Sequence, residues 1–330
     1  MKFVQASDFH VGKARSIPGY LERHSSVLYQ IADYCIANSL PLLLPGDIYD
    51  RKPLFKGTLL VEGWLNYLEQ NGVRTIVSPG NHEHIAGSEF LLDNLPLFPL
   101  QHVSVTGYNP DHFACQDTLV ITIPWGGYKE QEIRLFVETE LAKAASLGNL
   151  REFTVVMCHE CIVGSKVDNG TIMPKGCRLP DMPEVTYWAV GDIHVFQPTN
   201  LRNGFFAGAP IQFNFDEQEE KGFLVVDTLN PTEPEFVRTS FKPLRTVSSV
   251  DSVCNDAFYF VKGDIDEVLK ANRNGDVIRT DWAIEARQAI DFKPAGVTDG
   301  LADYLALNGF DSSYQQRGIT WVQARTGTGS

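Results

Sequence analysis

The feature that most constrains this chain is a series of short apolar runs that alternate with helical patterns. KFVQA at residues 2–6, LPLLL at 40–44 and RTIVS at 74–78 are typical of strands, and amphipathic patterns lie between them. LVITI at 119–123 and TVVMC at 154–158 continue the series. This β-α-β-α alternation predicts an α/β domain in which helices cover a layered sheet structure.

The pattern changes after residue 158. Strand-like segments then follow one another with little helix between them, at 186–190, 204–208, 222–226 and 235–239. The sharpest boundary candidate is FKPLRTV at 241–247, which precedes a segment typical of a small α+β module. We therefore predict a first domain over residues 1–242 and a second over 243–330 that ends in a loose tail.

The charge balance narrows the expected partners. Lys and Arg number 28 against 41 Asp and Glu, which gives a net charge of −13 at pH 7. Such a chain lacks the positive surface of most proteins that bind nucleic acids or anionic membranes. Divalent cations in a carboxylate-rich site, or a basic partner subunit, would supply that positive field, so DNA stays open as a substrate.

Cysteine usage and the first residues favour an intracellular protein. The six cysteines are scattered, and the start MKFVQASDFH has no apolar core of a secretory signal. We expect a reduced, cytoplasmic protein. No apolar run approaches the roughly 18–20 residues of a membrane-spanning helix, so no membrane partner is predicted.

Residues that bind divalent cations follow most of the strand-like runs. In open α/β sheets such residues gather just beyond the carboxyl ends of the strands. Asp8 and His10 come first, and their i, i+2 spacing on an extended segment points both side chains to one face. The others are Asp47 and Asp50 in LLLPGDIYDR, Asn81 and His82 in TIVSPGNHEH, His159 in VVMCHE, and Asp192 and His194 in YWAVGDIH.

Each of these elements has an ordinary structural explanation when taken alone. A D-x-H triplet often lies on a surface, GNHE can form a turn with a left-handed Asn, and a single His is often buried against backbone. Five such elements in one chain order make coincidence improbable and predict a metal site. Carboxylate, imidazole and amide donors favour Mn²⁺, Mg²⁺ or Fe²⁺ over structural zinc, and Cys158 has no second C-x-x-C partner and is better explained as a core residue.

These motifs, in this order over residues 8–194, resemble those of the calcineurin-like metallophosphoesterases. GDIHVFQ followed by FFAGAPIQFNFDEQEEKGFLVVD further resembles the SbcD-type DNA nuclease subunits and their phage recombination counterparts. The resemblance covers about residues 1–245 well and the remainder loosely. It implies a metallophosphoesterase β-sandwich flanked by helices, with a small C-terminal α+β domain.

The resemblance also implies roles for individual residues. It assigns one cation to Asp8, His10, Asp47 and His194, and a second to Asp47, Asn81, His159 and Asp192. His82 would support the leaving oxygen, Asp50 would orient His82, and Arg51 and His84 would contact phosphate. Two divalent cations are expected, with Mn²⁺ favoured and Mg²⁺ or Fe²⁺ as alternatives. Asp192 departs from the SbcD-like pattern, which has His there, and this change should alter the second cation's affinity.

The implied function is a two-metal DNA nuclease, exonucleolytic and also a candidate endonuclease. It would act with an SbcC-type ATPase, as a homodimer within a heterotetramer, in DNA recombination, repair or phage DNA processing in a bacterial or phage-infected cytoplasm. Residues 297–310 predict a short amphipathic helix that either packs on its own domain or docks on the ATPase. The alternatives are a stand-alone small-molecule phosphodiesterase or phosphatase, favoured by the negative charge, and a catalytically weakened DNA-end-binding scaffold.

Overall fold

The computed structural model describes residues 1–50, 55–85, 89–90, 100–107, 109–217, 220–248, 254, 256–261 and 277–280. Arg51 and the amphipathic segment 297–310 lie outside these ranges, as does most of the predicted second domain. None of the helices within them is both long enough and apolar enough to cross a membrane.

One six-stranded sheet contains the first strand of the chain. Its order is β14-β13-β1-β2-β3-β6. The pairs β1–β2, β2–β3 and β3–β6 are parallel, whereas β13 joins β1 in antiparallel register and β14 follows in the same way. The strands are β1 (Lys2–Gln5), β2 (Leu42–Pro45), β3 (Thr75–Ser78), β6 (Val103–Val105), β13 (Gly222–Asp227) and β14 (Glu235–Arg238).

A second six-stranded sheet faces the first. Its order is β11-β12-β10-β9-β8-β7, with β8, β9, β10 and β12 parallel and the two edge strands antiparallel. The strands are β7 (Asp111–Cys115), β8 (Thr118–Ile123), β9 (Phe153–His159), β10 (Tyr187–Gly191), β11 (Gln197–Pro198) and β12 (Gly204–Phe206).

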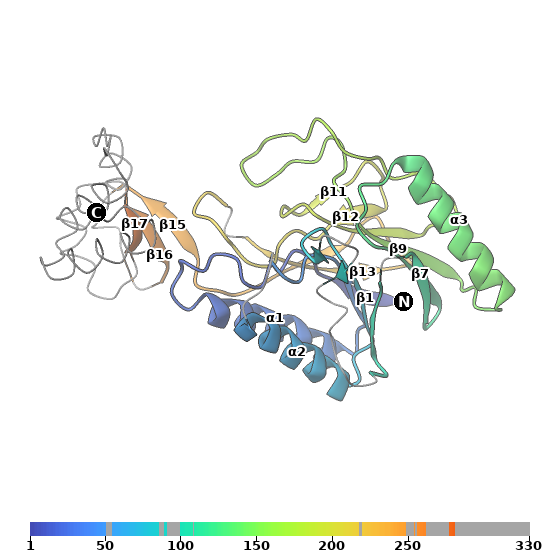
Figure 1. Cartoon of the computed structure of the whole chain (residues 1–330), viewed down its shortest axis with the longest axis horizontal. Coiled ribbons are helices and arrows are strands. Elements are labelled where there is room, and N and C mark those ends of the chain that lie inside the picture. Colours follow the sequence, from blue (N-terminus) through green and yellow to red (C-terminus); the bar gives the residue numbers. More distant parts are fainter. Residues whose placement is uncertain are drawn as a thin grey trace, which may run out of the picture.

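Within the described ranges, three helices cover the outer faces of the two sheets (Figure 1). Helices α1 (Tyr20–Asn38) and α2 (Phe55–Gln70) pack on the first sheet, and α3 (Glu130–Ser146) packs on the second. A third apolar cluster, which includes Phe3 and Val155, fills the space between the sheets. The α/β class and the β-sandwich flanked by helices, predicted above, are therefore confirmed.

Two smaller sheets complete the described structure. Strands β4 (His84–Ile85) and β5 (Glu89–Phe90) form an antiparallel pair. Strands β15 (Leu244–Val247), β16 (Phe258–Val261) and β17 (Val277–Thr280) form a parallel sheet. Leu244 and Phe258 pack against Ile17 in the loop before α1, so this sheet contacts the first residues of the sandwich.

Candidate metal centre

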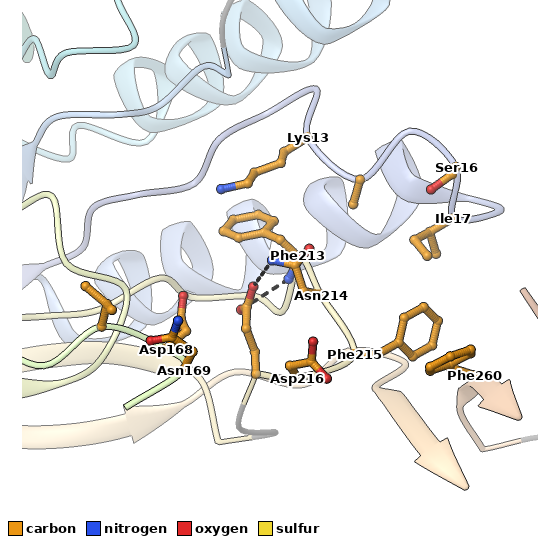
Figure 2. A pocket seen from close by; sticks show the side chains of 13 residues that line it. Lys13, Ser16, Ile17, Asp168, Asn169, Phe213, Asn214, Phe215, Asp216 and Phe260 are labelled. Carbon is orange, nitrogen blue, oxygen red and sulfur yellow. Dashed lines mark hydrogen bonds between the residues drawn. The ribbon is translucent and has the colours of Figure 1, made fainter. Parts of the chain in front are cut away.

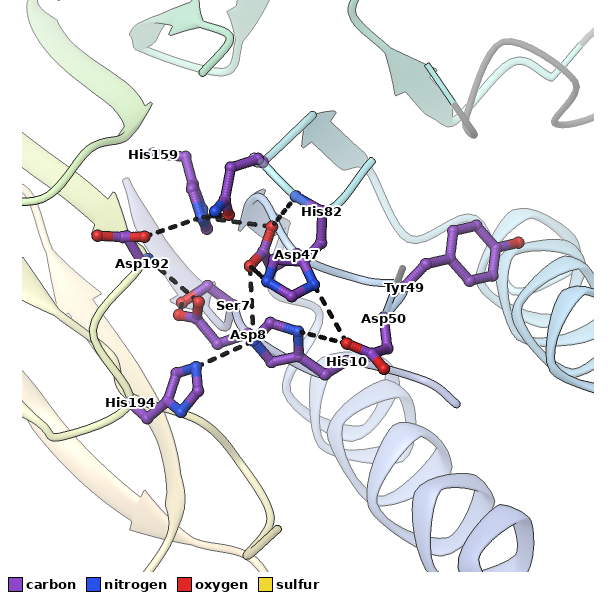
Figure 3. A network of polar contacts seen from close by, with 12 residues as sticks. Ser7, Asp8, His10, Asp47, Tyr49, Asp50, His82, His159, Asp192 and His194 are labelled. Carbon is purple, nitrogen blue, oxygen red and sulfur yellow. Dashed lines mark hydrogen bonds and ion pairs between the residues drawn. The ribbon is translucent and has the colours of Figure 1, made fainter. Parts of the chain in front are cut away.

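The predicted ligands come together at one edge of the sandwich. His159 ends β9 and the others follow β1, β2, β3 and β10, and the carboxyl ends of these strands lie near one another (Figure 3). Asp8, His10, Asp47 and His159 are buried, whereas Asn81, Asp192 and His194 are partly exposed. Residues separated by up to 186 positions in the chain thus form a single polar group.

Asp8, His10 and His194 form the first donor group, with one ligand atom of each within 4.8 Å of the others. The Nε2 atoms of His10 and His194 lie 2.9 Å apart. Two imidazole nitrogens at this distance either share a proton or bind the same cation. The nearby carboxylate of Asp8 completes a mixed oxygen and nitrogen donor set, which suits Mn²⁺ or Fe²⁺.

Asp47 lies between this group and a second one. Its Oδ2 atom is 3.5 Å from His10 Nε2, and its Oδ1 atom is 3.4 Å from His159 Nε2. Burial alone would raise the pKa of Asp47, but the imidazoles of His159 and His10 outweigh burial and hold the pKa below its ordinary value. The two oxygens therefore face two different ligands, as a carboxylate that bridges two cations must.

The second donor group surrounds His159. Its Nδ1 lies 2.8 Å from the Pro45 carbonyl oxygen and donates to it, so Nε2 is left to face the site. This Nε2 lies 3.3 Å from Asn81 Oδ1 and 3.8 Å from Asp192 Oδ1. The oxygen atoms around this nitrogen favour positive charge there, which either a proton on Nε2 or a divalent cation can supply. The residues present therefore fit two cations.

The backbone adopts unusual conformations at the ligands. Asp8, His10, Asp47 and Asp192 have φ values of 58°, 45°, 54° and 99°, in the left-handed region that few non-glycine residues adopt. Such strain gathers at functional sites, where the surrounding structure enforces it. Gly46, at φ 89°, lets the chain pass against His159, since a Cβ atom there would overlap the imidazole ring.

His82 and Asp50 lie beside the bridging carboxylate. His82 Nδ1 is 3.2 Å from Asp50 Oδ1, and His82 Nε2 is 3.9 Å from Asp47 Oδ2. Burial lowers the pKa of His82, but Asp50 and Asp47 together raise it above its ordinary value. The ring is partly exposed, so it can hold a proton and present it to a bound molecule. His84 is exposed and its ring lies 5.6 Å from that of Trp125.

Sequence reasoning gave no role to Glu83, although the residue lies in the GNHE motif. Its carboxylate is fully buried and accepts hydrogen bonds from the backbone N–H groups of Asp47 at 2.9 Å, Tyr49 at 2.7 Å and Gly80 at 2.8 Å. Glu83 thus joins the loop after β2 to the loop after β3. Its place beside Asn81 and His82 was the signal available in the sequence.

Asp168 and Lys221 were also missed. Asp168 Oδ2 lies 3.1 Å from His194 Nδ1, which turns His194 Nε2 toward His10. Lys221 Nζ lies 3.3 Å from Asp168 Oδ1, and it donates to the His194 carbonyl oxygen at 3.2 Å. Lys221 therefore fixes both the backbone of His194 and the carboxylate that orients its ring. Lys221 stands in the EEKG stretch quoted above, but Asp168 belongs to no motif.

A cavity of about 690 Å³ is lined by Phe213 and Asp168, two residues that contact this centre (Figure 2). The Phe213 ring contacts those of His10 and His194, and Lys13 Nζ lies 4.6 Å from its centroid on the cavity side. Among the described residues, its walls include none of the predicted metal ligands. Asp168, Asp216 and Glu217 line it together with Lys13, and Lys221 forms ion pairs with Asp168 and Glu217.

Comparison with known families decides the assignment. The profile of the calcineurin-like phosphoesterases matches residues 1–196, more than half of the chain, and every predicted ligand lies within the match. The chain belongs to the calcineurin-like phosphoesterase family. This phosphoesterase is therefore placed among the metal-dependent phosphoester hydrolases, whose members typically bind divalent cations, and its Asp and His clusters provide the ligands.

Solved structures similar to this phosphoesterase share little sequence with it. TT1561 of Thermus thermophilus has a TM-score of 0.45 and 12% sequence identity, with 72% of this chain and 99% of that chain covered. Another crystal structure has a TM-score of 0.42 and 16% identity, with the same two shares. No curated protein matches the sequence. TM-scores and sequence identities as low as these support no conclusion about the substrate.

Proposed function

We propose that this phosphoesterase is a two-metal DNA nuclease of the SbcD type, exonucleolytic and also a candidate endonuclease. The observation that carries the proposal is Asp47, whose two carboxylate oxygens face the two donor groups while His82 lies beside it. The DNA substrate is inferred from the SbcD-like sequence that follows Asp192, which contributes Lys221 to the support of His194.

Asp8, His10, Asp47 and His194 would hold one cation, and Asp47, Asn81, His159 and Asp192 the other. When bound, the pair of cations, Mn²⁺ in preference to Mg²⁺ or Fe²⁺, supplies positive charge to a phosphodiester and lowers the pKa of water. Asp47 would reduce the repulsion between the two positive charges, because its two oxygens face the two donor groups.

His82 would supply the proton that the leaving oxygen needs. Asp50 holds its Nδ1, so Nε2 is the nitrogen that faces the site. The raised pKa of His82 keeps the ring protonated closer to neutral pH than an ordinary histidine. Arg51, the further candidate for phosphate contact, lies outside the described residues, and His84 is exposed at the rim of the site.

Asp192 would make the second cation the more weakly held one. Its Oδ1 atom lies 3.8 Å from His159 Nε2, farther than the oxygens of Asn81 and Asp47. Burial, and then the neighbouring carboxylate of Asp8, raise its pKa. A short carboxylate that lies farther away and accepts a proton more readily is a poorer ligand than the histidine of the SbcD-like pattern.

The test uses the purified chain with EDTA or Mn²⁺ on linear duplex DNA and on bis-p-nitrophenyl phosphate. Mn²⁺-dependent digestion of DNA, abolished by Asp47→Ala and by Asp8→Ala, supports the nuclease. Turnover of the small diester alone would favour the stand-alone phosphodiesterase, which the net charge of −13 also favours. Bound metal with no turnover of either substrate would favour the DNA-end-binding scaffold. Asp192 is the reason for this alternative, because it replaces the histidine of the SbcD-like pattern.

The proposed partners are DNA and an SbcC-type ATPase, with this chain as a homodimer within a heterotetramer in a bacterial or phage-infected cytoplasm. Co-expression with the neighbouring reading frame, followed by nuclease assays with and without ATP, tests the partnership. Deletion of residues 297–330 should abolish co-purification with the ATPase while cleavage of the small diester persists. A truncated chain that still co-purifies would contradict docking through this segment.

A further inference from the structure

A cavity of about 470 Å³ opens beside the second donor group. Its walls include the ligand candidate Asp192 together with Trp125, Tyr128, Cys161 and Arg178. Asp192 belongs both to this wall and to the second donor group, where its Oδ1 lies 3.8 Å from His159 Nε2, so the cavity and the metal centre share a side chain. A molecule bound here would touch a phosphodiester held at the two donor groups.

The cavity offers aromatic faces. Trp125 is partly exposed, whereas Trp64 and Trp188, the other tryptophans in the described ranges, are fully buried. The Trp125 backbone N–H donates to the Pro79 carbonyl oxygen at 3.1 Å, which fixes the residue beside the loop that carries Asn81 and His82. Tyr128 is held by an edge contact with Phe136 at 4.8 Å. Rigid, accessible rings of this kind stack on nucleobases.

The cavity also offers an uncommitted positive charge. Arg178 is exposed and makes no hydrogen bond or ion pair with any residue that the structure describes. The backbone just before it is held in place, because the Cys177 N–H donates to the Cys161 carbonyl oxygen at 2.9 Å and the Val163 N–H donates to that of Cys177 at 3.0 Å. A guanidinium in this state is suited to pair with a phosphate.

Three carboxylates line the wall, those of Glu130, Glu160 and Asp192, and Lys129 lies among them as a second cation beside Arg178. Glu160 accepts hydrogen bonds from the backbone N–H groups of Gly126, Gly127 and Tyr128 at 3.1, 2.9 and 3.3 Å. These contacts fix the turn between Trp125 and Tyr128 and offset much of the negative charge that Glu160 would present to a phosphate. Arg178 thus remains available in a chain whose net charge is −13.

We propose that this cavity is a nucleotide subsite for a nucleic-acid strand. One base of the strand lies against Trp125 and Tyr128, and the phosphate attached to that nucleotide pairs with Arg178, while the scissile phosphate lies at the two donor groups. The proposal rests on the proposed nuclease function and names the part of the chain that selects a strand over a small diester.

The test measures binding and turnover separately. Binding is followed by the fluorescence anisotropy of a labelled single-stranded DNA hexanucleotide with Mn²⁺. All proteins in this experiment carry His82→Ala, so that cleavage of the DNA is slow. Arg178→Ala and Trp125→Ala should each weaken binding at least about tenfold, and Trp125→Phe should restore most of it. Arg202→Ala is the matched control, since Arg202 is an exposed arginine just before β12, at the opposite end of the parallel strands from the site, and it should leave binding unchanged.

Turnover is measured with methyl p-nitrophenyl phosphate in the protein with His82 intact. This diester is too small to fill the cavity, so kcat/KM should stay within about twofold in Arg178→Ala and Trp125→Ala. If kcat/KM for the diester falls by the same factor as the affinity for the hexanucleotide, the subsite is overturned. The variants would then act through Asp192. Unchanged hexanucleotide binding would overturn it as well.

Failure of the nuclease proposal gives a different result. In that case the protein with His82 intact does not cleave DNA, but the binding experiment still reports on the cavity. If the hexanucleotide binds and Arg178→Ala weakens that binding, the subsite is supported in a protein that binds DNA without cutting it. No measurable hexanucleotide binding in the His82→Ala background would overturn the subsite.

Discussion

Replacement of Glu83 by glutamine should destabilise the sandwich, because this buried carboxylate joins two ligand loops. Oε2 accepts from the N–H groups of Asp47 and Gly80, and Oε1 accepts from that of Tyr49. Glutamine has one acceptor oxygen, so at least one backbone N–H group loses its partner and meets the new amide NH₂ group. At pH 5 Glu83 is a neutral acid whose hydroxyl oxygen can still accept a hydrogen bond, whereas the glutamine NH₂ group cannot. One unsatisfied buried N–H group costs about 1–3 kcal/mol, so a loss of this size is expected at pH 5.

The loss should shrink as the pH rises in the metal-free protein. Burial, and then the charge of Asp47, raise the pKa of Glu83 to about 7. A carboxyl group with a raised pKa contributes its stability below its unfolded pKa of about 4.5 and loses it as the pH passes through 7. Glutamine has no such titration. Wild type should therefore lose up to about 3 kcal/mol relative to Glu83→Gln between pH 5 and pH 8.

The assay is urea unfolding of EDTA-treated protein, followed by circular dichroism from pH 5 to pH 8. Glu69→Gln is the matched control, since Glu69 also accepts from three backbone N–H groups, those of Gln101, His102 and Val103, but is within reach of water. Its backbone hydrogen bonds lower its pKa despite partial burial, so its effect should be small and level across this range. Equal losses in the two variants, or a Glu83→Gln loss that grows with pH, would refute the reasoning.

Three further variants test the site. His82→Ala should retain both cations and lose at least about 10²-fold in rate, as expected for a proton-transfer group, and loss of metal occupancy would show that His82 is a ligand instead. Asp192→His should bind the second Mn²⁺ more tightly in titration calorimetry, whereas identical affinity and stoichiometry would place Asp192 outside the ligands. Asp168→Ala should weaken Mn²⁺ binding about 10–100-fold with unchanged circular dichroism, because the His194 ring is no longer held, and unchanged affinity would show that His194 needs no such support.

The ligand candidates could be predicted because their signals are local. An apolar run indicates a buried strand, and an Asp, Asn or His at the end of that run indicates a metal ligand. Asp8 and His10 after β1, or His159 at the end of β9, need no knowledge of distant contacts. The five elements pointed to one site because parallel strands place their carboxyl ends at the same edge.

The supporting contacts could not be predicted in this way. Glu83 reaches the Asp47 N–H across 36 positions, Asp168 reaches His194 across 26, and Lys221 reaches Asp168 across 53. A carboxylate or an amine at such positions looks like any solvated charge in the sequence, since its hydrogen-bond partners come from other segments.

Most strands of the sandwich, the helices that cover them and the chemical type of each ligand could be predicted from the sequence, whereas β6, β7 and β11 could not. The features that could be predicted depend on the local spacing of apolar residues and on the identity of single side chains. The tertiary structure alone decided that β13 lies beside β1, with Lys2 opposite Asp227, and that Asp168, Lys221 and Glu83 hold the ligands in place. Burial and the closing of the two sheets create those contacts, because a hydrogen bond between distant residues forms only when the packed core brings its donor and acceptor together.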